Sequence, residues 1–379
     1  MLAGALVAGA ATALVATPAA TQAAAGESAT VEQMLKTGPS RNRIDVVILG
    51  DGYRAREMDK FEEDAEEFLD YMLMQQPFKT YRRYFNALRI ETPSRQSGAS
   101  RPDEPVDNVY GSRFGCFDIR RLLCADDDRV EEVVLDNLKR NQIDMVLVLV
   151  NDEEYGGSGG DYAVASTHEL SREVAVHEFG HSFGHLDDEY IDDNCGRYDD
   201  PWGFNVTQKR KKPQIPWKVW IPKKQTLPTP DDGDHGTGLY EGAYHCAEGW
   251  FRPTYDSIMR TNGAPAGPVN SEQFVRRFYE TIRPLDSVKP KSDKVRLARG
   301  TSKRFKSDLA DKRLKTISTV WRLDGKRISK RQASQVRFGD ISGRRSTLTL
   351  SVRDGTPLVR NDPKGVLIET RNWRVIKRK

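Results

Sequence analysis

The segment HEFGHSFGHLDDEY, residues 177–190, holds three of the chain's six histidines beside four acidic residues. An α-helix turns every ~3.6 residues, so His177 and His181 lie one turn apart on one face, and both imidazoles can reach a single metal ion. Glu178 follows His177, where its carboxylate can deprotonate a water molecule held by the metal, as in the HExxH pattern of metallopeptidases. The segment therefore predicts a catalytic zinc site with Glu178 as the general base.

The third zinc ligand is expected just after this helix. His185 continues the four-residue spacing, but its Cα would lie roughly 12 Å along the helix axis from that of His177, too far to share one ion. Gly184 is expected to end the helix. The chain can then turn so that a carboxylate from the acidic run at 187–189 reaches the metal, which leaves a fourth position open for water and substrate.

Residues around the HExxH core extend it toward the longer metzincin signature HExxHxxGxx(H/D). Glycine follows His177 at an offset of seven residues, and acids follow at offsets of ten to twelve. This signature expects a methionine-bearing turn downstream, and YDSIMR at residues 255–260 supplies one. Met259 is expected to pack under the metal without binding it. Metzincin spacing places the third ligand at Asp187.

Further motifs resemble the IgA-peptidase family of zinc metallopeptidases, numbered sixty-four, over most of the mature chain. The matching segments are VVILGDGY (46–53), PFKTYRRYFNALRIETPS (77–94), LVNDEEYGGSGG (149–160), HEFGHSFGHLDDEY (177–190), GLYEGAYHCAEGWFRP (238–253) and SIMR (257–260). Family members commonly read HEFGHSFGxLADEY, with alanine where this chain has Asp187. The resemblance therefore assigns the third ligand to Asp188, which we expect, with Asp187 as the alternative.

Hydrophobic periodicity predicts an α/β (α+β) arrangement for the first part of the chain. The expected elements are strands at 43–49, 86–92 and 145–150, an edge strand at 162–167, and amphipathic helices around Phe61 and after Asp128. The edge strand would offer its backbone groups to an extended peptide. With the zinc helix, this order predicts a metzincin-like catalytic domain over residues 26–285.

Residues 286–379 differ in character, because short alternating strands such as the one through Leu348, Leu350 and Val352 dominate. We expect an all-β immunoglobulin-like sandwich domain here, which the family resemblance also implies. The region carries 27 Lys and Arg against 9 Asp and Glu, whereas the preceding residues carry 32 against 46. No nucleic-acid motif accompanies these basic residues, so we expect no nucleic-acid partner; an anionic cell envelope or the acidic catalytic part is the expected counterpart.

An apolar run of Leu, Ala and Val at residues 2–16 precedes small residues and an alanine stretch at 23–25. This composition predicts a signal peptide over residues 1–25, and the run is short for a membrane span of ~20 residues. The protein is therefore expected to be secreted or periplasmic.

Four cysteines suit two disulfides in an exported protein, and three pairings are possible. Closeness in sequence favours Cys116 with Cys124. That leaves Cys195, just after the zinc segment, for Cys246, just before the methionine turn, where a bridge would brace the floor of the site.

Two weaker site hypotheses concern the region between the zinc segment and the methionine turn. The cluster DDGD at 231–234 could hold calcium, with a solvated turn as the alternative. In some metzincins a tyrosine two residues after the turn methionine stabilises the oxyanion, but here that position is Thr261. Tyr244 or His245 could replace it.

These features predict an exported zinc endopeptidase that hydrolyses a peptide or protein substrate. One rival is a surface-binding protein with little catalysis, in which the basic domain acts; the intact Glu178 argues against it. The other is a zinc amidase that cuts cell-wall peptides. Substrate sequence and oligomeric state do not follow from these motifs.

Overall fold

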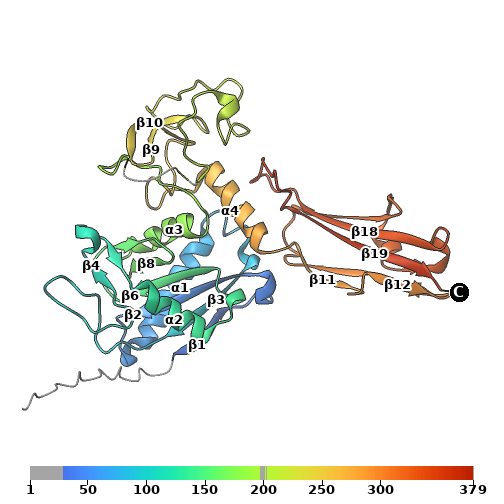
Figure 1. The fold of residues 1–379 in the computed structure, drawn as a ribbon, viewed down its shortest axis with the longest axis horizontal. Helices are drawn as coiled ribbons and strands as arrows, with labels where there is room; N and C mark the ends of the chain where they lie inside the picture. The colour runs from blue at the N-terminus through green and yellow to red at the C-terminus, as the bar shows by residue number, and fades with distance from the viewer. Residues whose placement is uncertain (1–28, 197–200, 202, 379) are drawn as a thin grey trace, which may run out of the picture.

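The computed structural model describes residues 29–196, 201 and 203–378. The expected signal peptide, residues 1–25, lies outside these residues. Across the described ranges, no helix combines the length and the apolar composition that a bilayer span requires. Figure 1 shows a mixed α/β part, an irregular part above it, and a β part that projects to one side.

A six-stranded sheet in the order β1-β3-β2-β6-β8-β7 organises the mixed α/β part. Its strands are β1 Thr30–Leu35, β2 Ile44–Asp51, β3 Phe85–Glu91, β6 Met145–Val150, β7 Gly157–Ser158 and β8 Ala163–Ser166. The four inner strands run parallel, and the two outer strands pair antiparallel to their neighbours. Strands β2 and β6 are buried along their whole length, as their continuous apolar runs predict.

The expectation of an edge strand at 162–167 was wrong, because β8 lies inside the sheet. The two residues of β7 form the edge instead, and a parallel bridge joins Gly157 to Leu122. A two-residue strand has too little periodicity to be recognised in sequence.

Helices cover both faces of this sheet. One core contains the apolar faces of α1 Met58–Met74, α3 Ser171–Ser182 and α4 Gly267–Thr281. A second core, on the opposite face of the sheet, contains the apolar face of α2 Asp127–Asn137. The N-cap of helix α2 is Asp126, two residues before the expected Asp128, and its carboxylate accepts the Arg129 backbone N–H at 3.4 Å.

The irregular part comprises the described residues of 191–266, which are 191–196, 201 and 203–266. Among these residues, β9 Tyr240–Ala243 and β10 Cys246–Arg252 form an antiparallel pair. A second short pair, β4 Arg113–Phe114 and β5 Leu123–Cys124, belongs to the rim of the first part. The four cysteines form the disulfides Cys116–Cys124 and Cys195–Cys246. These are the pairings favoured by closeness in sequence, and two disulfides fit an extracellular protein.

The β part is built on a five-stranded sheet in the order β12-β19-β18-β15-β16. Its elements are β11 Leu285–Lys289, β12 Lys294–Leu297, β13 Ser302–Lys303, β14 Lys306–Leu309, β15 Ile317–Leu323, β16 Lys326–Ile328, α5 Lys330–Ala333, β17 Val336–Arg337, β18 Arg345–Asp354 and β19 Ile368–Lys377. The pairs β11–β14 and β13–β17 contribute residues to the core that covers one face of this sheet. These strand pairs do not pack on the other face of the five-stranded sheet.

Buried polar contacts join the β part to the mixed α/β part. Asp354, the last residue of β18, is 1% exposed and accepts hydrogen bonds from the hydroxyls of Tyr81 at 2.7 Å and Tyr279 at 2.8 Å. Arg43, whose side chain is 2% exposed, donates to both carboxylate oxygens of Asp286 at 2.7 and 2.9 Å. Such bidentate and buried contacts hold the two parts in one relative position.

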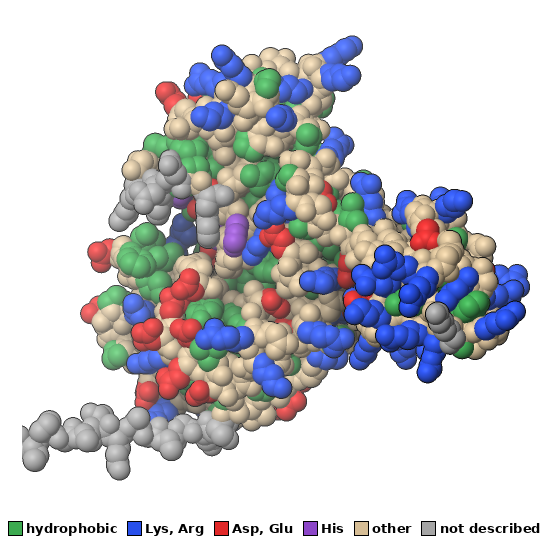
Figure 2. All heavy atoms as spheres, turned by 45° about the vertical axis from the view of Figure 1, so that its right-hand side comes forward, with side chains coloured by type: hydrophobic (Ala, Val, Ile, Leu, Met, Phe, Trp, Pro, Cys, Tyr) green, Lys and Arg blue, Asp and Glu red, His purple; other side chains and the backbone are tan. Residues whose placement is uncertain are grey.

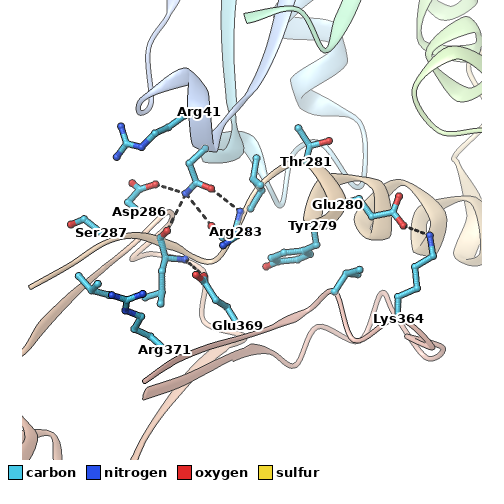
Figure 3. A pocket seen from close by; sticks show the side chains of 15 residues that line it. Arg41, Tyr279, Glu280, Thr281, Arg283, Asp286, Ser287, Lys364, Glu369 and Arg371 are labelled. Atoms are coloured by element: carbon cyan, nitrogen blue, oxygen red, sulfur yellow. Dashed lines mark hydrogen bonds and ion pairs between the residues drawn. The ribbon is translucent and has the colours of Figure 1, made fainter. Parts of the chain in front are cut away.

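A cavity of about 950 Å³ opens beside this junction (Figure 3). Across it, Lys364 pairs with Glu280 at 2.7 Å, and Glu369 accepts the Leu285 backbone N–H at 3.0 Å. The first contact joins helix α4 to the β part, whereas the second lies within the β part.

Candidate metal centre

Helix α3 presents His177 and His181 to one point, because they lie four residues apart. Each ring is oriented by a backbone carbonyl: His177 Nδ1 lies 2.8 Å from the Ile258 oxygen, and His181 Nδ1 lies 2.8 Å from the Leu186 oxygen. A carbonyl oxygen can only accept a hydrogen bond, so each imidazole carries its proton on Nδ1 and keeps the Nε2 lone pair free. The two Nε2 atoms lie 3.1 Å apart.

The Asp188 carboxylate completes a triangle with these nitrogens. Its Oδ1 lies 3.2 Å from Nε2 of His177 and 3.2 Å from Nε2 of His181. Ligands at ~2.0–2.1 Å in a tetrahedral zinc site lie roughly 3.3 Å from one another. The three atoms are therefore spaced as the ligands of one such ion would be.

The charges of these three groups favour a cation at the centre of the triangle. Asp188 Oδ1 is buried and has no hydrogen-bond partner when both imidazoles carry their proton on Nδ1. Burial lowers the pKa of His181, but with no metal bound the Asp188 carboxylate raises this pKa to about 10, so that a second proton would occupy the place expected for the ion. The histidines in turn hold the pKa of Asp188 far below its usual range despite its burial. The donor set thus fits a divalent metal ion, which would supply the positive charge.

The neighbouring acids point elsewhere. Asp187 Oδ2 accepts the Gly203 backbone N–H at 2.6 Å, away from the histidines. Glu189 is fully buried and accepts hydrogen bonds from Asn270 at 3.0 Å and Ser257 at 2.7 Å. Glu189 therefore ties the turn after α3 to helix α4 and to the methionine turn, while burial raises its pKa.

Glu178 stands beside the metal ligands, and its carboxylate lies within 4.8 Å of the ligand atoms of His177 and His181. It also abuts the backbone of Gly159, where any Cβ would collide with Glu178 Oε2. The glycine-rich segment before β8 therefore lets the chain pass directly next to this carboxylate.

Met259, expected to be the residue of a methionine turn, packs against helix α3. It is fully buried, and its sulfur occupies the space that a side chain on Gly180 would need. Its carbonyl oxygen accepts the Glu189 backbone N–H at 2.8 Å. With the Ile258 carbonyl holding His177, this turn supports the site from beneath.

A cleft of about 790 Å³ contains the candidate site. Its walls include His177, Glu178 and Asp188, and two exposed apolar side chains, Phe117 and Ile119, stand at the rim. Gly157 of β7 and its bridge partner Leu122 also line the cleft.

Two cleft residues complement this centre. Tyr190 lines the cleft, and burial followed by the nearby Asp188 carboxylate raises its pKa. His245 Nδ1 lies 3.1 Å from Asp192 Oδ1, and its Nε2 lies 3.5 Å from Asp188 Oδ2. A carboxylate behind an imidazole is typical of the outer shell of metal sites.

Tyr244, one of the two residues considered for stabilising the oxyanion, is not among the residues that line this cleft. Its ring packs against Trp250 with centroids 4.7 Å apart, and its backbone N–H donates to the Asp188 carbonyl at 2.9 Å. Tyr190 is the last residue of the zinc segment, so it could have been considered from the sequence. Its spacing from the metal ligands, however, does not indicate a role.

The acidic cluster considered for calcium uses its carboxylates locally. Asp231 pairs with Arg252 at 2.6 Å, Asp232 pairs with His235 at 2.6 Å, and Asp234 accepts the Gly236 backbone N–H at 2.8 Å. These contacts match the solvated turn that was the alternative.

A model of one protein family, IgA Peptidase M64, matches residues 32–237, a span that includes α3 and all three atoms of the triangle. No curated protein matches the chain.

Proposed function

We propose that this chain, which belongs to the IgA peptidase M64 family of metallopeptidases, is a zinc endopeptidase whose ion is held by His177, His181 and Asp188. The observation that carries this proposal is the triangle of 3.1, 3.2 and 3.2 Å between their ligand atoms. Asp188 is preferred to Asp187 because the latter carboxylate is engaged with the Gly203 backbone.

When bound, zinc would lower the pKa of a water molecule and withdraw electrons from the scissile carbonyl. Glu178 would take the proton of the attacking water and pass it to the leaving amine nitrogen. Its position beside the two histidines and next to Gly159 supports this role.

Tyr190 is proposed, in place of Tyr244, to donate a hydrogen bond to the carbonyl oxygen as negative charge develops there. Its place in the cleft wall supports the role, whereas Tyr244 packs on Trp250. His245, backed by Asp192, is proposed to orient Asp188 from behind.

The finer architecture belongs to the same proposal. Residues 26–285 would form a metzincin-like catalytic domain, supported by the zinc helix over a methionine turn, and residues 286–379 an immunoglobulin-like domain, supported by the five-stranded sheet and the strands packed on it. Export through the signal peptide is supported by the two disulfides.

The decisive experiment replaces Glu178 by Gln, which keeps the shape and removes the base. The variant should bind zinc as the wild type does, while peptide hydrolysis falls by about 10²–10⁴-fold. A library of unlabelled peptides, analysed by mass spectrometry, would reveal cleavage. If the variant with full zinc content retained most of its turnover, Glu178 would not be the base.

A further inference from the structure

The five-stranded sheet of the β part has one uncovered face. Along β18, the residues Ser346, Leu348, Leu350 and Val352 point into the core, and the alternate residues point outward. Cross-strand pairing extends this outward face over β12, β19, β15 and β16.

The outward face is basic. Six exposed outward residues lie in its half away from the junction, and we call them the distal basic patch: Lys294, Arg296, Arg322, Arg327, Arg345 and Arg374. Arg353 lies outward nearer the junction. No outward position of these five strands is acidic within the described residues. Figure 2 shows Lys and Arg side chains gathered over this part of the molecule.

The patch has no partner within the chain. The ion pairs of the β part use other bases, such as Lys312 with Asp308 and Lys364 with Glu280; in the part of the chain that the structure describes, none pairs a patch residue. Asp324 borders the patch, but its carboxylate accepts the Thr347 backbone N–H at 2.7 Å and the Ser342 hydroxyl at 2.8 Å. The alternative that the basic face docks on the acidic catalytic part was therefore wrong for these residues, which are all exposed.

The spacing of the basic side chains indicates which anionic groups fit the patch. Lys294 and Arg374 are direct neighbours on adjacent strands, as are Arg322 and Arg327, and adjacent strands lie ~4.8 Å apart. One tetrahedral phosphate offers several oxygens and can accept guanidinium groups from two strands at once, whereas a carboxylate offers two oxygens in one plane. The patch lies on an open pleated surface, which suits a linear polymer.

We propose that the distal basic patch binds a linear phosphate-bearing polymer that carries no nucleobases. The phosphates would lie across the strands and neutralise side chains that otherwise repel one another. This binding does not depend on the zinc site, so it can be tested separately from the proposed function.

The test uses the full chain and immobilised long-chain inorganic polyphosphate, with binding followed by biolayer interferometry. The wild type should bind, and its affinity should fall steeply between roughly 50 and 200 mM salt. A patch variant with Arg296, Arg322, Arg345 and Arg374 changed to Gln should bind at least about tenfold more weakly, with a shallower salt dependence.

A matched variant removes four exposed charges from the layer over the opposite face: Lys303, Lys330, Arg331 and Arg337, each changed to Gln. It should stay within about twofold of the wild type, because it loses the same net charge but none of the patch. Equal losses in both variants would overturn the proposal, as would absence of binding by the wild type. Equal or tighter binding to single-stranded DNA, to polyglutamate, or to vesicles of phosphatidylglycerol would assign the face to a different partner and overturn it too.

Discussion

The junction between the two parts makes a quantitative prediction for Asp354→Ala. The substitution removes the acceptor of the Tyr81 and Tyr279 hydroxyls and of the Thr356 backbone N–H at 3.0 Å. Tyr279 keeps a partner, since its hydroxyl lies 2.8 Å from that of Tyr84. The Tyr81 hydroxyl also keeps a hydrogen bond with the Thr356 side chain, so the Thr356 backbone N–H is the buried donor left unsatisfied, at about 1–3 kcal/mol. The free energy of unfolding should therefore fall by about 1–3 kcal/mol.

Urea denaturation followed by tryptophan fluorescence and by circular dichroism measures this loss. Asp354→Asn retains an acceptor oxygen and should cost less than half as much, which makes it the matched control. Tyr81→Phe removes one donor and should cost about 1 kcal/mol. If Asp354→Ala lost less than about 1 kcal/mol, the buried contact would not couple the two parts and the reasoning would fail.

Three further predictions concern the site and the junction. Zinc content after dialysis should fall further for Asp188→Ala than for Asp187→Ala, because only the first carboxylate faces both histidines; equal or reversed losses would contradict the ligand assignment. Gly159→Ala should lower kcat at least about tenfold without loss of zinc, because the new methyl group displaces the proposed base; unchanged turnover would show that the segment can move aside. Burial raises the pKa of Asp286, but its hydrogen bonds to Arg43 outweigh burial and lower the pKa overall. The folded value thus lies below the unfolded ~3.9, so this stabilisation is complete above pH ~4 and is lost as the pH falls through the folded value. Asp286→Asn should be less stable than the wild type at pH 7 and should approach it in acid; a pH-independent difference would argue against the ion pair.

Much of the catalytic core could be predicted because its signals are local. The apolar run of β6 and the four-residue spacing of His177 and His181 depend only on strand and helix geometry. The choice between Asp187 and Asp188 could not be settled this way. It depends on the turn after α3, where His185 has the positive φ of 53° that glycine would normally supply.

Other features depend on contacts between distant segments. His245 reaches Asp188 and Asp192 because residues 188–192 and 244–245 run side by side, a pairing with no periodic signal. The charge excess of the β part was plain in composition, but only strand register shows which bases share one face.

The Cys195–Cys246 disulfide links catalytic competence to the redox state of the surroundings. Cys246 directly follows His245, and the Tyr244 backbone N–H holds the carbonyl of Asp188. In a reducing cytoplasm this covalent tie would be absent, and the strip of chain that backs the third ligand would be free to separate. Under the proposed function, the metal centre would therefore reach its final arrangement only in an oxidising compartment, in keeping with the proposed export.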